Sequence, residues 1–120
     1  MTTRLDQHLS QAVASGAVPG ETRGCLRLGE LRTMQALVEE ALAAGAIGLS
    51  TGTFYPPAVK ATTEEIIAVG KPLTAHQALY VTHMRDESSQ VMESLEETFR
   101  IGRELGIPVV VSHHKVQNKP

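Results

Sequence analysis

Three short apolar runs, separated by segments of helical periodicity, constrain the fold of this chain more than any other feature. The runs are Ala46–Ser50, Leu79–His83 and Val109–Val111, and they are apolar rather than alternating. Such strands are buried on both faces, as in a parallel sheet covered by helices. The order helix, strand, helix, strand, helix, strand therefore predicts an α/β fold built from parallel β/α units.

The segments between the runs show where helices begin and end. An apolar stripe from Met34 to Leu42 predicts a helix with Gly45 as its C-terminal cap. A capping box at Thr62–Glu65 predicts the start of a second helix, which we expect to continue to about His76. A third helix, ending at Gly106, is expected to bury one face formed by Val91, Leu95, Phe99, Gly102 and Leu105.

Three parallel strands form a poor independent sheet because both edges remain open. The sequence also ends at Pro120, where a helix covering the last strand is expected. We therefore expect residues 31–120 to be part of a TIM-like (β/α) barrel that is incomplete in this chain. Residues 1–30 predict only a short helix and a glycine-containing loop, and form a poorly defined N-terminal segment.

Composition excludes several classes of partner. A net charge of -2, with two Phe, two Tyr and no Trp, offers neither a basic surface nor stacking platforms for nucleic acid. No apolar stretch is long enough to span a membrane, and the N-terminus lacks the apolar core of a signal peptide. The single cysteine, Cys25, excludes an intrachain disulfide. We expect a cytoplasmic protein that binds neither nucleic acid nor membrane.

Polar residues follow all three predicted strands. Because the carboxyl ends of parallel strands share one rim, Ser50–Tyr55, His83–Asp86 and Ser112–Lys115 are expected to converge there. His83 shares side-chain parity with Val81, and His113 shares it with Val109 and Val111. On that basis one histidine of each strand end is expected to face the barrel interior.

Two interpretations of these histidines remain open. Each can be an ordinary half-buried histidine bonded to a backbone carbonyl, or the pair can bind zinc. A catalytic zinc normally takes three protein ligands, so further ligands would have to come from elsewhere. Cys25 is interpreted as an incidental small residue, and Arg85–Glu87 as a salt-bridged helix start. Tyr55 and Lys115 together could receive a carboxylate.

Four ordered motifs resemble one known family. They are Ala44–Pro57, Tyr80–Glu87, Leu95–Gly106 and Pro108–Lys115, and they resemble the D-aminoacylases, which are N-acyl-D-amino-acid deacylases of the amidohydrolase superfamily. The resemblance covers about residues 31–120. It implies a zinc-dependent (β/α) barrel that hydrolyses the amide bond of N-acyl-D-amino acids to a carboxylate and a free D-amino acid.

The resemblance also implies roles for individual residues. By motif, His83 and His113 would bind zinc, Lys115 and Tyr55 would hold the substrate carboxylate, and Phe54 would line the side-chain pocket. The family's His-x-His motif, metal-binding cysteine and catalytic aspartate have no counterpart here. The resemblance therefore implies a central fragment, inactive when isolated, whose zinc site could stand empty.

Two alternatives remain. One is a non-catalytic module that forms a homo-oligomer through its open sheet edges or complements a partner fragment. The other is a different amidohydrolase, such as one that opens a cyclic amide, because a barrel alone does not select a substrate.

Overall fold

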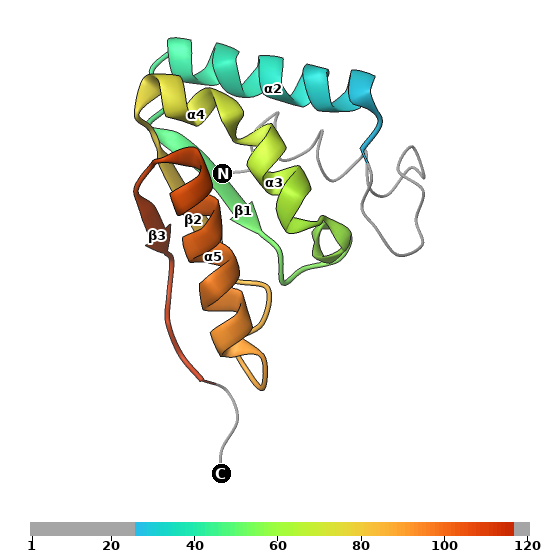
Figure 1. The fold of residues 1–120 in the computed structure, drawn as a ribbon, viewed down its shortest axis with the longest axis vertical. Helices are drawn as coiled ribbons and strands as arrows, with labels where there is room; N and C mark the ends of the chain where they lie inside the picture. The colour runs from blue at the N-terminus through green and yellow to red at the C-terminus, as the bar shows by residue number, and fades with distance from the viewer. Residues whose placement is uncertain (1–25, 117–120) are drawn as a thin grey trace.

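The computed structural model describes residues 26–116, which form a three-stranded sheet with helices (Figure 1). Its elements in chain order are α2 (Leu28–Ala43), β1 (Gly48–Gly52), the 3-10 turn η1 (Ala58–Lys60), α3 (Thr63–Val69), α4 (Lys71–His76), β2 (Leu79–His83), α5 (Val91–Leu105) and β3 (Val109–Val111). The strands lie in the order β1-β2-β3, and both pairs are parallel. The predicted α/β fold of parallel β/α units is confirmed.

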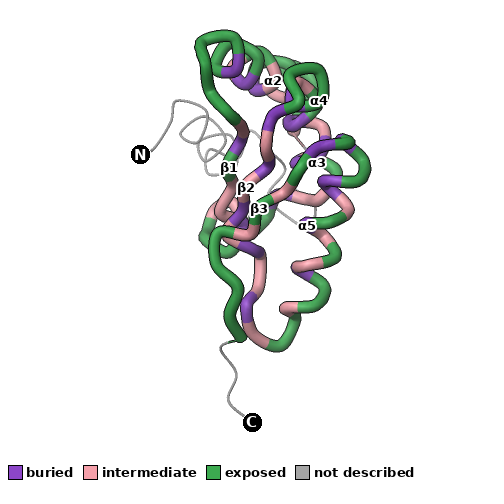
Figure 2. Tube along the Cα trace, turned by 90° about the vertical axis from the view of Figure 1, so that its left-hand side faces the viewer, coloured by how far each residue is buried: buried purple, intermediate pink, exposed green. Residues whose placement is uncertain are grey.

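The helices form a layer on one face of the sheet. Figure 2 shows α3, α4 and α5 on the same side of the three strands, and α2 packs against α3 and α4. Between this layer and the sheet lies the apolar core, which includes Leu49 on β1 and Tyr80 on β2. Among residues 26–116, no helix covers the opposite face. No helix in this part of the chain is long and apolar enough to cross a membrane.

Strand register shows which residues face the helices. Tyr80 pairs with Leu49 and Val109, and all three contact the core. Val81 pairs with Ser50 and Val110, whose side chains belong to the uncovered face, and Val110 is 43% exposed. Alternation along each strand therefore separates a packed face from an open one.

The end of α2 explains why β1 starts later than the sequence predicts. Gly45 has a φ of 108°, and its N–H donates to the carbonyl of Leu42 while the N–H of Ala46 donates to the carbonyl of Ala41. These two bonds form a Schellman motif that uses the chain through Ala46. The strand consequently begins at Gly48 rather than at Ala46.

The second predicted helix is two helices. Its capping box is confirmed, since Thr62 Oγ1 accepts from the N–H of Glu65 and the Glu65 carboxylate accepts from the N–H of Thr62. The helix breaks at Gly70 because Pro72 has no N–H for the carbonyl of Ala68. The side chain of Gln35 on α2 donates to that carbonyl instead, at 2.6 Å.

The buried face of α5 differs from the predicted one. The fully buried residues are Ser94, Thr98, Ile101, Gly102 and Leu105, whereas Phe99 is 45% exposed. Small side chains face the sheet because α5 approaches it closely: a Cβ at Gly102 would lie 2.6 Å from Cγ1 of Val109. The expected face is therefore wrong at Phe99, while Val91 and Leu95 are half-buried and Gly102 and Leu105 are buried as predicted.

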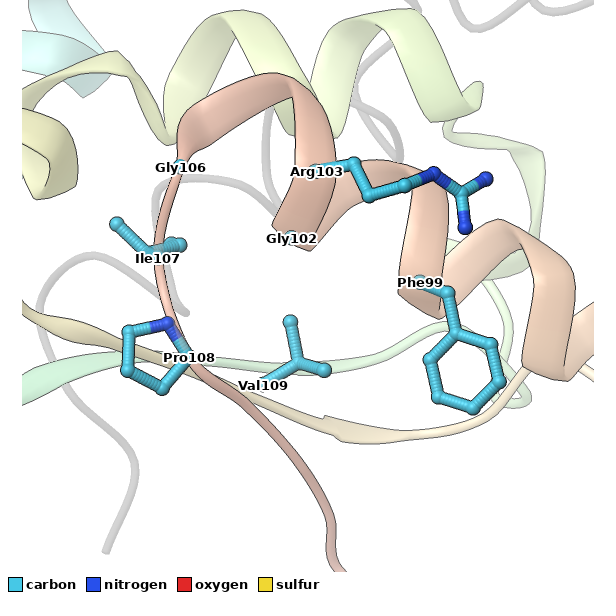
Figure 3. A pocket seen from close by; sticks show the side chains of 7 residues that line it. All are labelled: Phe99, Gly102, Arg103, Gly106, Ile107, Pro108 and Val109. Carbon is cyan, nitrogen blue, oxygen red and sulfur yellow. The ribbon is translucent and has the colours of Figure 1, made fainter.

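Phe99 instead borders an apolar hollow of about 440 Å³ between α5 and the amino end of β3 (Figure 3). Its wall is made of Phe99, Gly102, Arg103, Gly106, Ile107, Pro108 and Val109. The hollow lies at the opposite end of β3 from Ser112–Lys115. Most of the predicted N-terminal segment, including Cys25, lies outside the described residues, and α2 already begins at Leu28.

Candidate metal centre

Two aromatic residues of the loop after β1 surround His83. Register pairs Gly52, the last residue of β1, with His83, the last residue of β2, so this loop leaves the sheet beside the histidine. Tyr55 stacks on the His83 ring, with centroids 5.0 Å apart and an angle of 28° between the planes. Phe54 meets the same ring edge to face at 5.4 Å. The structure therefore gathers Phe54 and Tyr55 around His83, as the shared rim predicts.

The second predicted histidine lies directly against the first. Nδ1 of His83 is 2.5 Å from Nε2 of His113, and the ring centroids are 4.3 Å apart. The parity argument for His113 is nevertheless wrong, because Val109 on β3 faces the helices. β3 ends at Val111, and beyond the bond from the N–H of Ser112 to Thr82 the chain leaves the ladder. His113 can contact His83 because the chain no longer follows the strand at that point.

A third group at the rim was missed by sequence reasoning. Glu87 is buried, with Oε1 2.5 Å from Nδ1 of His113 and Oε2 4.0 Å from Nζ of Lys115. Arg85–Glu87 was interpreted as a helix start, but α5 begins only at Val91. Its position in the sequence could have identified Glu87, because it follows a strand whose carboxyl end already carries a candidate ligand, His83.

Arg85 fastens the rim loops to α5. Its guanidinium donates to the carbonyls of Val59 and Ala61, at 2.6 and 2.8 Å, and pairs with Glu97 on α5 at 2.7 Å. Thr63 at the start of α3 donates to the same carboxylate. The predicted salt bridge of Arg85 thus exists, and it holds the segment after Phe54 and Tyr55 against the helix layer.

Two further polar groups near the rim, those of Asp86 and Tyr80, have partners within the protein. Backbone and side-chain donors of Ser88, followed by the N–H of Gln90, lower the pKa of Asp86 below its usual value. Burial raises the pKa of Tyr80, whose hydroxyl lies 2.7 Å from Oγ1 of Thr51. These residues support the loops and the sheet beneath the histidines.

The donor set suits a metal ion. Among the described residues, His83, Glu87 and His113 form a group whose potential ligand atoms all lie within 4.8 Å of one another. Two imidazole nitrogens bound to one tetrahedral zinc would be about 3.3 Å apart. These two nitrogens are 2.5 Å apart here, so zinc binding requires them to separate by less than 1 Å. Small side-chain rotations of the half-buried His83 and the exposed His113 can provide this movement. The residues fit the ion.

Curated relatives match most of the chain. D-aminoacylase of Alcaligenes xylosoxydans xylosoxydans is 64% identical over 91 residues, which are 76% of this chain and 19% of the relative. N-acyl-D-aspartate deacylase of the same organism is 50% identical over 101 residues, 83% of this chain and 20% of the relative. No family model matches. The chain thus spans about a fifth of the length of these relatives.

Solved structures agree with these matches. A crystal structure of D-aminoacylase, described as defining a novel subset of amidohydrolases, superposes with a TM-score of 0.78 at 58% identity, covering 86% of this chain and 22% of that one. The chain therefore matches a fragment of D-aminoacylase-like amidohydrolases. N-acyl-D-glutamate deacylase of Bordetella bronchiseptica, complexed with zinc and a phosphonate inhibitor, matches with a TM-score of 0.72 at 37% identity, covering 75% of this chain and 19% of that one.

These matches bear out the resemblance drawn from the four motifs, and the β/α units correspond to part of an amidohydrolase barrel. One further D-aminoacylase structure, with a TM-score of 0.78 at 57% identity over 86% of this chain and 22% of that one, concerns a binuclear metal centre activated by one metal and attenuated by a second.

Proposed function

We propose that this segment contributes two zinc ligands and part of the substrate clamp to an enzyme that hydrolyses N-acyl-D-amino acids. The observation that carries the proposal is the meeting of His83 Nδ1 and His113 Nε2 at 2.5 Å on the rim. Two sequence-distant nitrogens that converge at the carboxyl ends of parallel strands occupy the usual place of a barrel active site. The zinc found in the related N-acyl-D-glutamate deacylase supports the choice of metal.

In this proposal, His83 and His113 hold the ion through the two nitrogens that face each other. Bound there, zinc supplies Lewis acidity toward the scissile carbonyl and toward water. The aromatic rings of Phe54 and Tyr55 against His83 limit the orientations of its imidazole.

Substrate recognition falls to residues on both sides of the histidine pair. Tyr55, beside His83, and Lys115, near Glu87, are 55% and 60% exposed and are therefore free to meet a ligand. A phenol hydroxyl and an ammonium can together bind the carboxylate of an acyl amino acid. Phe54 offers an apolar surface, 43% exposed, to the amino-acid side chain.

We infer that the isolated chain is inactive, because a catalytic zinc normally takes more protein ligands than the two assigned here. Hydrolysis also requires a general base, and the resemblance assigns that role to an aspartate outside this sequence. Both groups would come from the rest of an enzyme.

A graft tests this proposal. The 91 matching residues of this chain would replace the corresponding segment of the Alcaligenes D-aminoacylase, with the same graft carrying His113→Ala as its matched inactive form. We expect zinc-dependent release of D-amino acid from an N-acetyl-D-amino acid by the first graft alone, and none from the L-enantiomer. A folded, zinc-loaded graft that opens only cyclic amides would contradict the proposed substrate class. Hydrolysis by the pure 120-residue chain would contradict the inference that the active site also needs groups from the rest of an enzyme.

A further inference from the structure

A buried carboxylate faces two proposed site residues. The Glu87 side chain is 1% exposed, and a buried carboxylate is strongly destabilising unless charged or donor groups compensate it. Its Oε1 lies 2.5 Å from Nδ1 of His113, and its Oε2 lies 4.0 Å from Nζ of Lys115. The groups that face this carboxylate therefore include a proposed metal ligand and a proposed substrate-binding cation.

The backbone around Glu87 is held in place without any ligand. Oδ1 of Asp86 accepts from the N–H of Ser88 at 2.6 Å and from that of Gln90 at 3.1 Å. The N–H of Asp86 in turn donates to Oγ of Ser94 on α5, at 2.9 Å. Residues on both sides of Glu87 are thus tied to one another and to the helix, which fixes where its side chain begins.

The chemistry of a carboxylate decides which nitrogen of His113 is available. An ionised carboxylate accepts hydrogen bonds and cannot donate them, so the nitrogen facing it is the one that carries hydrogen. In a neutral imidazole the other nitrogen then holds the lone pair. For His113 that nitrogen is Nε2, which faces Nδ1 of His83 at 2.5 Å. Glu87 therefore directs the lone pair of His113 toward His83.

We propose that Glu87 is a positioning residue that orients His113 for metal binding and does not itself bind the ion. This inference rests on the function proposed above. The two nitrogens of an imidazole point to opposite sides of the ring, so an oxygen at Nδ1 is turned away from an ion bound at Nε2. Carboxylates in this outer position fix the tautomer of a ligating histidine, and their loss weakens metal binding by roughly 10- to 100-fold.

The tautomer of His113 tests the inference without metal. Long-range proton–nitrogen NMR of the metal-free 120-residue chain, at a pH where His113 is neutral, should show hydrogen on Nδ1. Glu87→Met, which keeps the side-chain length and removes the acceptor, should abolish that preference, and Glu87→Gln, which keeps an acceptor oxygen, should retain it. Glu93→Gln, on the exposed side of α5, is the matched control. An unchanged His113 tautomer in folded Glu87→Met would overturn the inference.

Zinc titration of the same variants gives a second readout. We expect Glu87→Met to bind Zn²⁺ roughly 10- to 100-fold more weakly than the parent chain, and Glu87→Gln to lose less. Equal affinity in Glu87→Met, or a loss as complete as that of His113→Ala, would overturn the positioning role. If Glu87→Met does not fold, Glu87→Asp provides the comparison through its shorter carboxylate. The same titration is performed on the grafted enzyme, where a folded graft that binds no zinc would contradict the proposed function, while the tautomer would still decide the role of Glu87.

Discussion

The two ends of the three-stranded sheet are built from different kinds of residue. The amino end of β3 meets α5 in an apolar hollow, where Gly102 and Val109 bring the backbones close together (Figure 3). The carboxyl end gathers imidazoles, aromatic rings and a buried carboxylate around His83 and His113. The same strands therefore carry packing at one end and candidate chemistry at the other, the division expected of a (β/α) barrel.

The largest effect should come from the packed side. Ile101 is 1% exposed between α5 and the sheet, and Ile101→Ala should lower the free energy of unfolding by about 2 to 5 kcal/mol because it leaves a cavity. Met92→Ala, on the exposed side of the same helix, is the control and should change it by less than about 0.5 kcal/mol. Urea denaturation measures both. If Ile101→Ala weakened zinc binding while the chain stayed folded, the two ends would not be separable.

At the carboxyl end, Lys115→Ala should raise KM in the grafted enzyme. A hydrogen bond to a charged group contributes about 1.5 to 3 kcal/mol, which corresponds to a roughly 10- to 150-fold rise in KM. Lys71→Ala, an exposed lysine at the start of α4, is the matched control. Steady-state kinetics on an N-acetyl-D-amino acid decide the outcome, and an unchanged KM would count against the clamp.

The N-cap of α3, Thr62, provides a further test of the comparison between the two ends of the sheet. Thr62 Oγ1 accepts the N–H of Glu65 at 3.2 Å, and Thr62→Ala should lower the free energy of unfolding by about 1 kcal/mol. Zinc affinity should not change, because this residue serves the helix and not the metal. Thr33→Ala, at an exposed position of α2, is the control. Chemical denaturation measures the stability and zinc titration measures the affinity. Weaker zinc binding by folded Thr62→Ala would contradict this separation of roles.

The smallest effect concerns pH. Backbone and side-chain bonds from Ser88, then the N–H of Gln90, lower the pKa of Asp86 below 3.8. Because the folded pKa lies below the unfolded one, the stabilisation is present above the unfolded pKa and is lost as the pH falls through the folded pKa. Asp86→Asn should therefore make the free energy of unfolding depend less on pH in the acid range. NMR titration of the carboxyl group checks the direction, and a pKa at or above 3.8 would contradict it.

Local rules predicted the parts of the fold that depend on neighbouring residues. Gly45 as the cap of α2 and the Thr62–Glu65 capping box both depend on bonds within a few residues. Gly106 likewise ends α5 with a φ of 65°. The convergence of His83 and His113 at one rim followed from the general behaviour of parallel β/α units.

Long-range contacts explain the misses. Small Ser94 and Thr98 became buried because α5 comes close to β3 at Gly102, which no helical periodicity reveals. The contact of His113 depends on the chain leaving β3 after Val111, so strand parity could not predict it. Glu87 was missed because an acidic residue before a helix already has an ordinary explanation.

Zinc-edge X-ray absorption of the folded chain with one equivalent of Zn²⁺ tests the central claim most directly. The account predicts imidazole nitrogens at about 2.0 to 2.1 Å from the metal. One histidine contribution should disappear in each of His83→Ala and His113→Ala, while His76→Ala, a surface histidine paired with Glu39 on α2, should leave the spectrum intact. Identical spectra from the parent chain and His113→Ala would contradict the claim that the rim of this segment forms part of a zinc centre.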